Sequence, residues 1–557
     1  MMHRAYKITI LTVMLFGYLC ATFAQDTVFN RVVTVERDYQ PEVEEAQAIS
    51  TTPTFIQHTP KLNPVVYSTY SEPLSIGYNL PTLPASENRF TSPSPLNGMV
   101  EGAFGHRNTH FLFGYRLQKN NTSLDLYANH DAYWGRDALS QSVVGLQLTH
   151  HFRGADFYLG VEADNDAYAY RPTFDWRVLC TGDAHIGIKS TNHHPFQYRI
   201  QTGYTAFVAA DRALEHHVKS HIDLWWSNQR HSSGVKAYVQ NTLYSIFDLQ
   251  RTVSPRHAMR FEPFYEYKDK HIYLHAGVNL DMNIGAGELL STVDNLSFAP
   301  SPNVRFEWHT TNNLFHVYAN AMGTYGLSSL EEYLGYNRYL NVEQGLTWQY
   351  PRAYTPVDAQ LGFKLRPIKT LLIDIYGGYA YLYNAYNMEA VLDENGHLTD
   401  YILWLKNYQR WKVGASLHYH YRDIVELNVA GNYYFYQQDP IPPMDPNDPY
   451  FQENRIKGTT IFDRPNWDLT ARIDVHIDSN WSIYSDNYFA GSRWVYTSLG
   501  KAQLRPIIAL NMGCRYAIDK RLSAYVQLED YLHRKNDIFY GYQSQGCHFL
   551  AGVKYLF

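Results

Sequence analysis

The sequence predicts an all-β protein, a transmembrane antiparallel up-and-down β-barrel of about 22 strands in residues 97–557. Three observations lead to this fold class. From Gly98 onward, successive segments alternate between apolar and polar side chains. Short and long connections alternate between these segments, and the last segment ends in an aromatic residue. We count about 22 segments and accept a range of about 18 to 24, because the existence of segments is better determined than their number.

Residues 271–283 show the alternation most clearly. The side chains of Ile272, Leu274, Ala276, Val278, Leu280 and Met282 are apolar, whereas the intervening residues include His271, His275, Asn279 and Asp281. The same pattern occurs in residues 157–164, 371–381, 425–435 and 467–477. Because alternate side chains of a strand point to opposite faces, each segment needs one apolar and one aqueous environment. In a barrel these environments are lipid and lumen.

Composition excludes a helical membrane protein. The chain has 557 residues, 47 basic and 53 acidic, for a net charge of -6, and its mean hydropathy is -0.38. No stretch after the first 25 residues is long and apolar enough for a membrane-spanning helix. The 48 tyrosines suit membrane interfaces, where one end of the ring is dry and the other wet. The chain has no basic stripe, so we expect no nucleic-acid partner.

Connection lengths separate the barrel from a secreted β-sandwich, which would also alternate. Short connections follow even-numbered segments, for example at 119–121, 268–270 and 478–480. The long connections follow odd-numbered segments and lie at about 165–181, 284–301, 325–357, 384–407, 438–465 and 533–546. Outer-membrane barrels have short periplasmic turns and long extracellular loops, whereas a sandwich has no reason to sort its loops in this way. An even number of strands also puts both termini in the periplasm.

The first 96 residues differ from the rest. Residues 1–24 have the features of a secretory signal peptide, with Arg4 and Lys7 before an apolar run and a cleavage site at Thr22-Phe23-Ala24. Residues 25–96 contain nine of the 25 prolines, which favour extended, unpaired backbone. We expect this part to form a strap in the periplasm or in the barrel lumen. The remaining cysteines, Cys180, Cys514 and Cys547, are odd in number and do not suggest a disulfide framework.

The C-terminal segment resembles the closing strand of bacterial outer-membrane β-barrels. Phe549, Val553, Tyr555 and Phe557 form one apolar row that ends in an aromatic residue with a free carboxylate. In such barrels this terminal aromatic residue is the recognition signal for the assembly machinery. The resemblance implies two partners, that machinery and the lipid bilayer, and a location in the outer membrane of a Gram-negative bacterium.

The start of the chain resembles a family of barrels without a plug domain. The residues that carry this resemblance are Val32–Pro41, Pro95-Leu96-Asn97-Gly98, Gly105–His110, Leu126–His130 and Trp134-Gly135. Together they are similar to the TonB-dependent-receptor-like outer-membrane proteins of Bacteroides-type bacteria. TonB-dependent transporters resemble 22-stranded barrels that an N-terminal domain plugs. The roughly 70 residues before the first strand are too few for that domain, so the resemblance implies a barrel without a plug.

A further feature of the resemblance concerns TonB itself. Val32, Val33, Thr34 and Val35 have the apolar, extended character of a TonB box, the segment that pairs with TonB by strand addition. The alternative is an ordinary β-prone piece of the strap. TonB therefore remains one of two kinds of partner to consider, and the other is a periplasmic or surface protein.

We find no catalytic motif and expect no enzyme activity, no cofactor and no metal. His418 and His420 share one strand face and could hold a metal ion, but lumenal histidines more often face water. Asp439, Asp445, Asn447 and Asp448 lie among prolines in a loop that lacks the spacing of a calcium site. Inward positions carry charges of both signs. The sequence therefore shows no ring of like charges that would predict a pore selective for anions or cations.

Two functions remain open. The first is uptake or passage of a solute, in the manner of a porin or receptor. The second is a scaffold that transports nothing and holds partners in an outer-membrane or cell-surface complex, with aromatic loops as anchors. A 22-stranded barrel is wide and would leak if it were empty, so the long loops, the strap or a partner must occlude it.

Overall fold

The computed structural model describes residues 97–135, 138–170, 175–191, 194–209, 213–246, 255–284, 298–311, 314–325, 329–341, 353–422, 424–438 and 464–557. The expected signal peptide (residues 1–24), the strap (25–96) with Val32–Val35, and the acidic loop from Asp439 to Tyr450 lie outside these residues. They therefore remain predictions.

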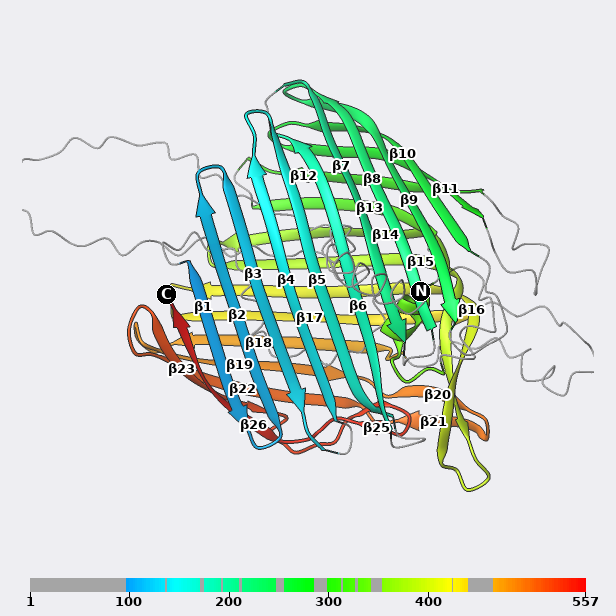
Figure 1. The fold of residues 1–557 in the computed structure, drawn as a ribbon, viewed down its shortest axis with the longest axis vertical. Helices are drawn as coiled ribbons and strands as arrows, with labels where there is room; N and C mark the ends of the chain where they lie inside the picture. The colour runs from blue at the N-terminus through cyan, green and yellow to red at the C-terminus, as the bar shows by residue number, and fades with distance from the viewer. Residues whose placement is uncertain are drawn as a thin grey trace, which may run out of the picture. The chain divides into compact units, whose positions relative to one another are not determined.

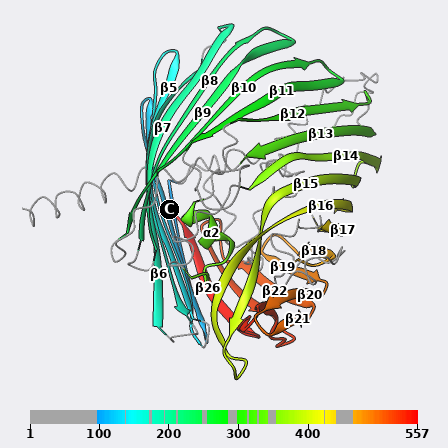
Figure 2. The ribbon, with the colours of Figure 1, turned by 90° about the vertical axis from the view of Figure 1, so that its right-hand side faces the viewer.

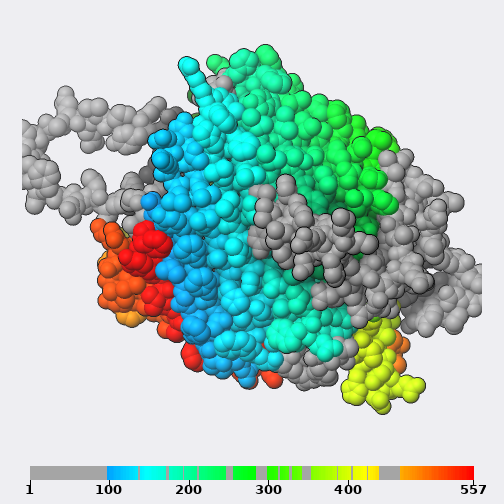
Figure 3. All heavy atoms as spheres, in the orientation of Figure 1, coloured from blue at the N-terminus to red at the C-terminus, as the bar shows by residue number. Residues whose placement is uncertain are grey.

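Twenty-two strands form a closed antiparallel barrel, which confirms the predicted fold class and strand number (Figure 1). Its strands are β1 (Gly98–Gly105), β2 (Asn108–Lys119), β3 (Thr122–Tyr133), β4 (Leu139–His151), β5 (Ala155–Tyr170), β6 (Asp175–Ser190), β7 (Phe196–Ala209), β8 (Ala213–Ser227), β9 (His231–Ile246), β10 (Arg256–Lys268), β11 (Ile272–Ile284), β12 (Phe298–His309), β13 (Phe315–Tyr325), β14 (Tyr354–Ile368), β15 (Leu371–Leu392), β16 (Leu398–Tyr421), β17 (Val425–Gln438), β18 (Trp467–His476), β19 (Trp481–Ala490), β22 (Ile507–Ala517), β23 (Leu522–Glu529) and β26 (His548–Leu556). Each strand pairs with the next barrel strand along the chain, and neighbouring strands form a continuous wall (Figure 3).

The ring closes between the first and last strands. β1 and β26 pair from Met99↔Leu556 to Gly105↔Leu550. Gly98 and Phe557 extend this ladder, because each backbone N–H donates to the other residue's carbonyl, at 2.8 and 2.9 Å. Closure gives every strand two neighbours and leaves no open edge inside hydrocarbon. The first and last residues of the barrel, Gly98 and Phe557, therefore lie at the same rim.

The two rims differ as the connection lengths predict. At the rim that holds the termini, no turn exceeds five residues, the length of residues 310–314. We call this the short-turn rim, and the opposite rim, with connections such as 326–353 and 439–466, the long-loop rim. Side chains stabilise the tight turns. The Asp519 carboxylate accepts hydrogen bonds from the backbone N–H groups of Arg521 and Leu522, which lower its pKa.

Two of the expected long loops are wrong. Residues 165–181 are mostly strand, because β5 continues to Tyr170 and β6 begins at Asp175. Residues 384–392 belong to β15 and residues 398–407 to β16, and these two strands extend beyond their neighbours as a hairpin. The hairpin β20 (Arg493–Thr497) with β21 (Gly500–Leu504) lies against this extension, and β20 pairs with β15 at Glu389↔Tyr496. Strand pairing therefore continues at the long-loop rim beyond the ends of the neighbouring strands.

The two barrel faces are inverted relative to a water-soluble protein. In β11, Ile272, Val278 and Met282 are exposed on the outside, whereas His275 and Asp281 are buried toward the lumen. In the C-terminal strand β26, Phe549, Val553 and Tyr555 are likewise exposed on the outside. Such an outer surface needs an apolar solvent.

Six tyrosines reach across the wall on the lumenal side and cover a glycine of the next strand. In each pair the two residues are direct cross-strand partners, and a methyl group on the glycine would overlap the tyrosine ring. The pairs are Tyr127–Gly145, Tyr158–Gly187, Tyr318–Gly362, Tyr376–Gly414, Tyr484–Gly513 and Tyr525–Gly552. The glycines leave room for rings that line the lumen.

The remaining elements are small. The hairpin β24 (Asp537–Phe539) with β25 (Tyr542–Gln543) lies in the connection between β23 and β26. The helix α2 (Leu330–Tyr336) lies between β13 and β14. In the part of the chain that the structure describes, no helix is long and apolar enough to cross a membrane. Cys180, Cys514 and Cys547 form no disulfide bond in the described part of the chain, and all three are partly exposed.

Candidate functional site

The connection from β13 to β14 folds inward at the long-loop rim. Its described part, Ser329–Asn341, contains α2 and lies between opposite walls of the barrel (Figure 2). We call Ser329–Asn341 the mouth segment. Leu330, Tyr333, Leu334 and Leu340 of this segment are buried, so it packs against the barrel and does not project from it.

The sequence Ser329-Leu330-Glu331-Glu332 starts the helix. The Ser329 hydroxyl accepts a hydrogen bond from the Glu332 backbone N–H at 3.0 Å, as a serine N-cap does. Two further backbone N–H groups of the first turn have no partner within the helix. Glu215 of β8 is the partner of both groups. Its carboxylate oxygens accept hydrogen bonds from the backbone N–H of Leu330 at 3.0 Å and of Glu331 at 2.9 Å. One wall carboxylate thus holds the start of α2.

His217 lies next to this contact and is fully buried. Its Nε2 atom is 3.4 Å from the Glu215 carboxylate and 3.5 Å from that of Glu331. Its Nδ1 atom is 2.9 Å from the Thr242 hydroxyl of β9. The Nε2 atom of His217 therefore lies near one carboxylate from the wall and one from the helix.

The other end of the mouth segment binds several elements. Arg338 donates to Asp166 of β5 at 2.9 Å, and the Tyr168 hydroxyl of β5 donates to the Arg338 carbonyl. The Asn337 amide contacts the Met388 sulfur of β15 at 2.8 Å. Asn341 donates to the Asp400 carboxylate and to the Tyr401 carbonyl of β16. Polar contacts therefore tie this end to three strands.

An aromatic cluster completes this attachment. Tyr339 stacks on Tyr542 of β25, with ring centroids 3.5 Å apart and planes 14° apart. Its edge also meets Tyr168 at 5.5 Å and Phe539 of β24 at 5.9 Å. The mouth segment thus spans from β5 and β8 to the β15–β16 extension and the β24–β25 hairpin. It narrows the mouth of the barrel.

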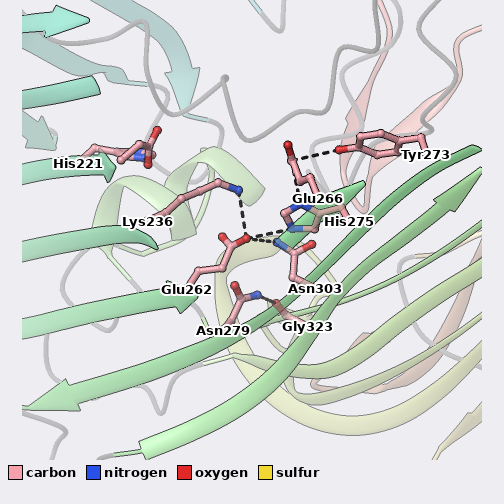
Figure 4. Close-up of polar contacts among 10 residues, drawn as sticks. His221, Lys236, Glu262, Glu266, Tyr273, His275, Asn279, Asn303 and Gly323 are labelled. Carbon is pink, nitrogen blue, oxygen red and sulfur yellow. Dashed lines mark hydrogen bonds and ion pairs between the residues drawn. The ribbon is translucent and has the colours of Figure 1, made fainter. Parts of the chain in front are cut away.

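Below the mouth, the lumenal wall from β9 to β12 carries a polar network (Figure 4). Glu262 of β10 accepts from Lys236 of β9 at 3.1 Å and from Asn303 of β12 at 2.8 Å. His275 of β11 lies between Glu262 at 3.2 Å and Glu266 at 3.0 Å. Each strand contributes a partner to its neighbour, so the network also fixes strand register.

Several charged side chains on the described wall form ion pairs. Arg260 binds Asp281 at 2.7 Å and Arg410 binds Asp358 at 3.0 Å. Arg472 binds Asp474 at 2.7 Å and lies 3.6 Å from Asp486. The expected mixture of signs in the lumen is therefore present, as cross-strand and same-face ion pairs.

The C-terminal aromatic row faces outward. Phe549, Val553, Tyr555 and Phe557 are all exposed, and Phe557 stacks on Tyr115 of β2 with centroids 5.8 Å apart. Their role as an assembly signal remains a prediction. Of the histidine pair His418 and His420 that the sequence raised as a metal candidate, the His418 ring contacts the Asn428 side chain at 2.5 Å. In the described ranges, no three His, Cys, Asp or Glu side chains are grouped to hold a metal ion.

Sequence reasoning missed the mouth segment. The pattern Ser329-x-x-Glu332 is a capping-box signal and could have located the helix. No local signal identifies Glu215 or Asp166 as its partners, because they lie 115 and 172 residues away along the chain. An inward acidic side chain on a strand has the same sequence pattern whether it faces water or a helix.

No protein-family profile matches the chain, and no curated protein matches it in sequence. Solved structures match its fold. The copper transporter OprC superposes with a TM-score of 0.62 at 9% identity, over 83% of this chain and 80% of that one. The ferric enterobactin receptor of Pseudomonas aeruginosa gives 0.59 at 11%, over 83% and 80%. The ferric-catecholate import receptor Fiu of E. coli K12 gives 0.59 at 10%, over 84% and 82%.

The chain shares the barrel fold of these transporter and receptor structures, over about four-fifths of its length. This agrees with the 22-stranded barrel that the sequence predicted. Identities of this size show the fold alone, so the substrates of these proteins do not transfer to this chain. The absence of a plug and the Bacteroides-type origin remain predictions.

Proposed function

We propose that the protein is an integral outer-membrane barrel of a Gram-negative bacterium that takes up a solute or lets it pass. The carrying observation is the closed 22-stranded barrel with an apolar outside, a polar lumen and a mouth segment across the long-loop rim. In this proposal the long-loop rim faces the cell exterior and the short-turn rim the periplasm. The receptors and transporter of similar fold support a transport role rather than an enzymatic one.

We further propose that the protein lacks a plug domain and that residues 25–96 act as a strap. TonB is a candidate partner through Val32–Val35, and the assembly machinery is one through the C-terminal row that ends in Phe557. Deleting residues 32–35 should abolish uptake in cells if TonB drives it. The same deletion should leave passage through the purified barrel unchanged.

Planar-bilayer recordings test the transport proposal. We expect the full-length protein to conduct in short events and a variant with a Gly-Ser linker in place of Ser329–Asn341 to conduct for most of the recording, because that variant lacks the constriction at the mouth. A second variant that lacks residues 25–96 tests the strap in the same assay. A folded barrel that never conducts in any of these three forms would refute the proposal.

A scaffold is the second candidate, and one observation favours it. The β15–β16 hairpin extends beyond the neighbouring strands and is braced by β20 (Figure 1). Such a projection can serve as a contact surface for a partner protein. Extraction in mild detergent distinguishes the two functions: a fixed partner that leaves when residues 386–404 are shortened supports a scaffold, whereas a protein that remains alone opposes it.

A further inference from the structure

The short-turn rim carries an excess of basic side chains. Its ten turns, each taken with the strand residue on either side, contain nine lysines and arginines among the described residues, and all nine are exposed. They are Lys119, Arg153, Arg230, Lys268, Lys270, Lys369, Arg422, Lys520 and Arg521. The sequence places four carboxylates in the same turns, those of Asp269, Asp423, Asp478 and Asp519. Basic side chains thus exceed acidic ones by five at this rim, although the whole chain has a net charge of -6.

The described carboxylates of this rim have local partners. Asp478 accepts hydrogen bonds from the backbone N–H groups of Asn480 and Trp481, at 2.7 Å each. Asp519 binds the backbone of its own turn in the same way, and Asp269 lies 3.8 Å from Arg230. Among the residues that the structure describes, the other eight cations of the rim form no ion pair. Their ammonium and guanidinium groups are therefore available to an anionic partner.

The basic side chains are distributed around the ring of strands. Seven of the ten turns carry at least one of them, from the turn between β2 and β3 to the turn between β22 and β23. A lipid leaflet surrounds a barrel on all sides, so its head groups meet every turn. A folded protein beside the barrel would meet only some of the turns. The distribution therefore favours a lipid partner.

Aromatic side chains place these turns at the level of lipid head groups. Trp226, Trp308 and Trp481 are exposed on the outside of the barrel, within two residues of a short turn. Tryptophan is enriched where hydrocarbon meets the head groups. A strand rises about 3.3 Å per residue, so the cations of the turns lie a few ångströms beyond these rings, where lipid phosphates lie. Arg422 also lies over the exposed ring of Tyr421, at 5.3 Å from its centroid.

We propose that this basic ring binds the phosphate groups of anionic phospholipids of the phosphatidylglycerol type, in the leaflet that the short-turn rim contacts. With the long-loop rim toward the cell exterior, this is the periplasmic leaflet. The inference goes beyond the transport function and rests only on the location of the barrel in a membrane. Lysine and arginine are the usual ligands of phosphate in proteins, and basic residues close to an anionic leaflet are attracted to it.

Spin-labelled lipids test the ring in bilayers of phosphatidylcholine that contain the full-length protein. Electron paramagnetic resonance measures how strongly labelled phosphatidylglycerol associates with the protein, relative to labelled phosphatidylcholine. We expect the wild type to prefer phosphatidylglycerol about threefold at low ionic strength. The preference should disappear in about 1 M NaCl, where the Debye length falls to about 3 Å.

A variant in which the five lysines of the ring are replaced removes the excess of positive charge. Its substitutions are Lys119→Gln, Lys268→Gln, Lys270→Gln, Lys369→Gln and Lys520→Gln. We expect its preference to fall to about one, because glutamine cannot carry the charge that attracts phosphate. Heat-modifiable migration in gels checks that the variant is folded.

Two triple variants provide a matched comparison. Lys268→Gln, Lys369→Gln and Lys520→Gln together remove three cations of the ring, and about half of the preference should be lost. Lys501→Gln, Arg505→Gln and Lys535→Gln together remove three exposed cations at the long-loop rim. This control should keep the wild-type preference, because its cations do not belong to the ring.

The outcomes separate this inference from the proposed function. A wild type that enters the bilayer and binds both lipids equally would overturn the ring and leave the transport function standing. Equal losses in the two triple variants would also overturn it, since net charge alone would then explain the preference. If the five-lysine variant keeps its preference but loses an acidic protein that copurifies with the wild type, the ring binds protein and the lipid assignment is wrong. A protein that enters no bilayer would remove the membrane location and the transport function together.

Discussion

Tyrosine and glycine form a repeated pair in the lumen of this barrel. The ring of Tyr484, for example, lies where a side chain on Gly513 would point. Aromatic cover of a glycine on the neighbouring strand adds contact area and sets register, which a strand glycine otherwise weakens. This use of tyrosine differs from the expected placement of tyrosines at the membrane interfaces. The composition records the number of tyrosines but not the partner that each ring covers.

Gly513→Ala should destabilise the barrel by about 1–3 kcal/mol, because the new methyl group forces the Tyr484 ring out of its position. Thermal or urea unfolding in detergent measures this as a lower midpoint. Gly102→Ala is the control, since an added Cβ at Gly102 meets no atom within 4 Å. Equal midpoints for the two variants would show that the tyrosine cover contributes nothing.

At the scale of elements, the alternation of apolar and polar residues located the strands correctly but did not locate their ends. The segments were correct because each strand must satisfy two environments along its whole length. Alternation continues wherever a strand has partners, so it does not mark the membrane boundary. The strands β15 and β16 therefore run through a region expected to be a loop. The mouth segment was missed because its contacts are distant in sequence and depend on closure of the ring.

The β20–β21 hairpin anchors the connection that carries β24 and β25. Arg493 is almost fully buried and donates to the carbonyl groups of Asp537 and Ile538. Arg493→Met should leave these carbonyls without that donor and loosen residues 530–547. Trypsin cleavage at Arg534 or Lys535 should then become about tenfold faster.

Arg505→Met provides the matched control for this prediction. Arg505 binds the Asp537 carboxylate at 3.1 Å from an exposed position, where an ion pair contributes little to stability. Its loss should change the cleavage rate by less than about twofold. Equal cleavage rates for the Arg493 and Arg505 variants would refute the anchoring role of Arg493.

At the scale of the whole molecule, closure explains why a chain of negative mean hydropathy suits a membrane. Only the outward half of each strand meets lipid, and the ring satisfies the backbone of all strands. The even number of segments and the sorting of their connections were readable from sequence, since a closed antiparallel ring imposes both. The wall ion pairs were not readable, because they depend on register between strands.

The seam between β1 and β26 tests the central claim most directly. In a background without native cysteines, Phe104→Cys with Ala551→Cys places two thiols on directly opposed residues. We predict that oxidation of intact cells links them within one chain and that the linked chain is found in the outer-membrane fraction, released only by detergent. A chain that stays unlinked, or that is recovered dissolved in periplasmic extract, would contradict a closed barrel in the outer membrane.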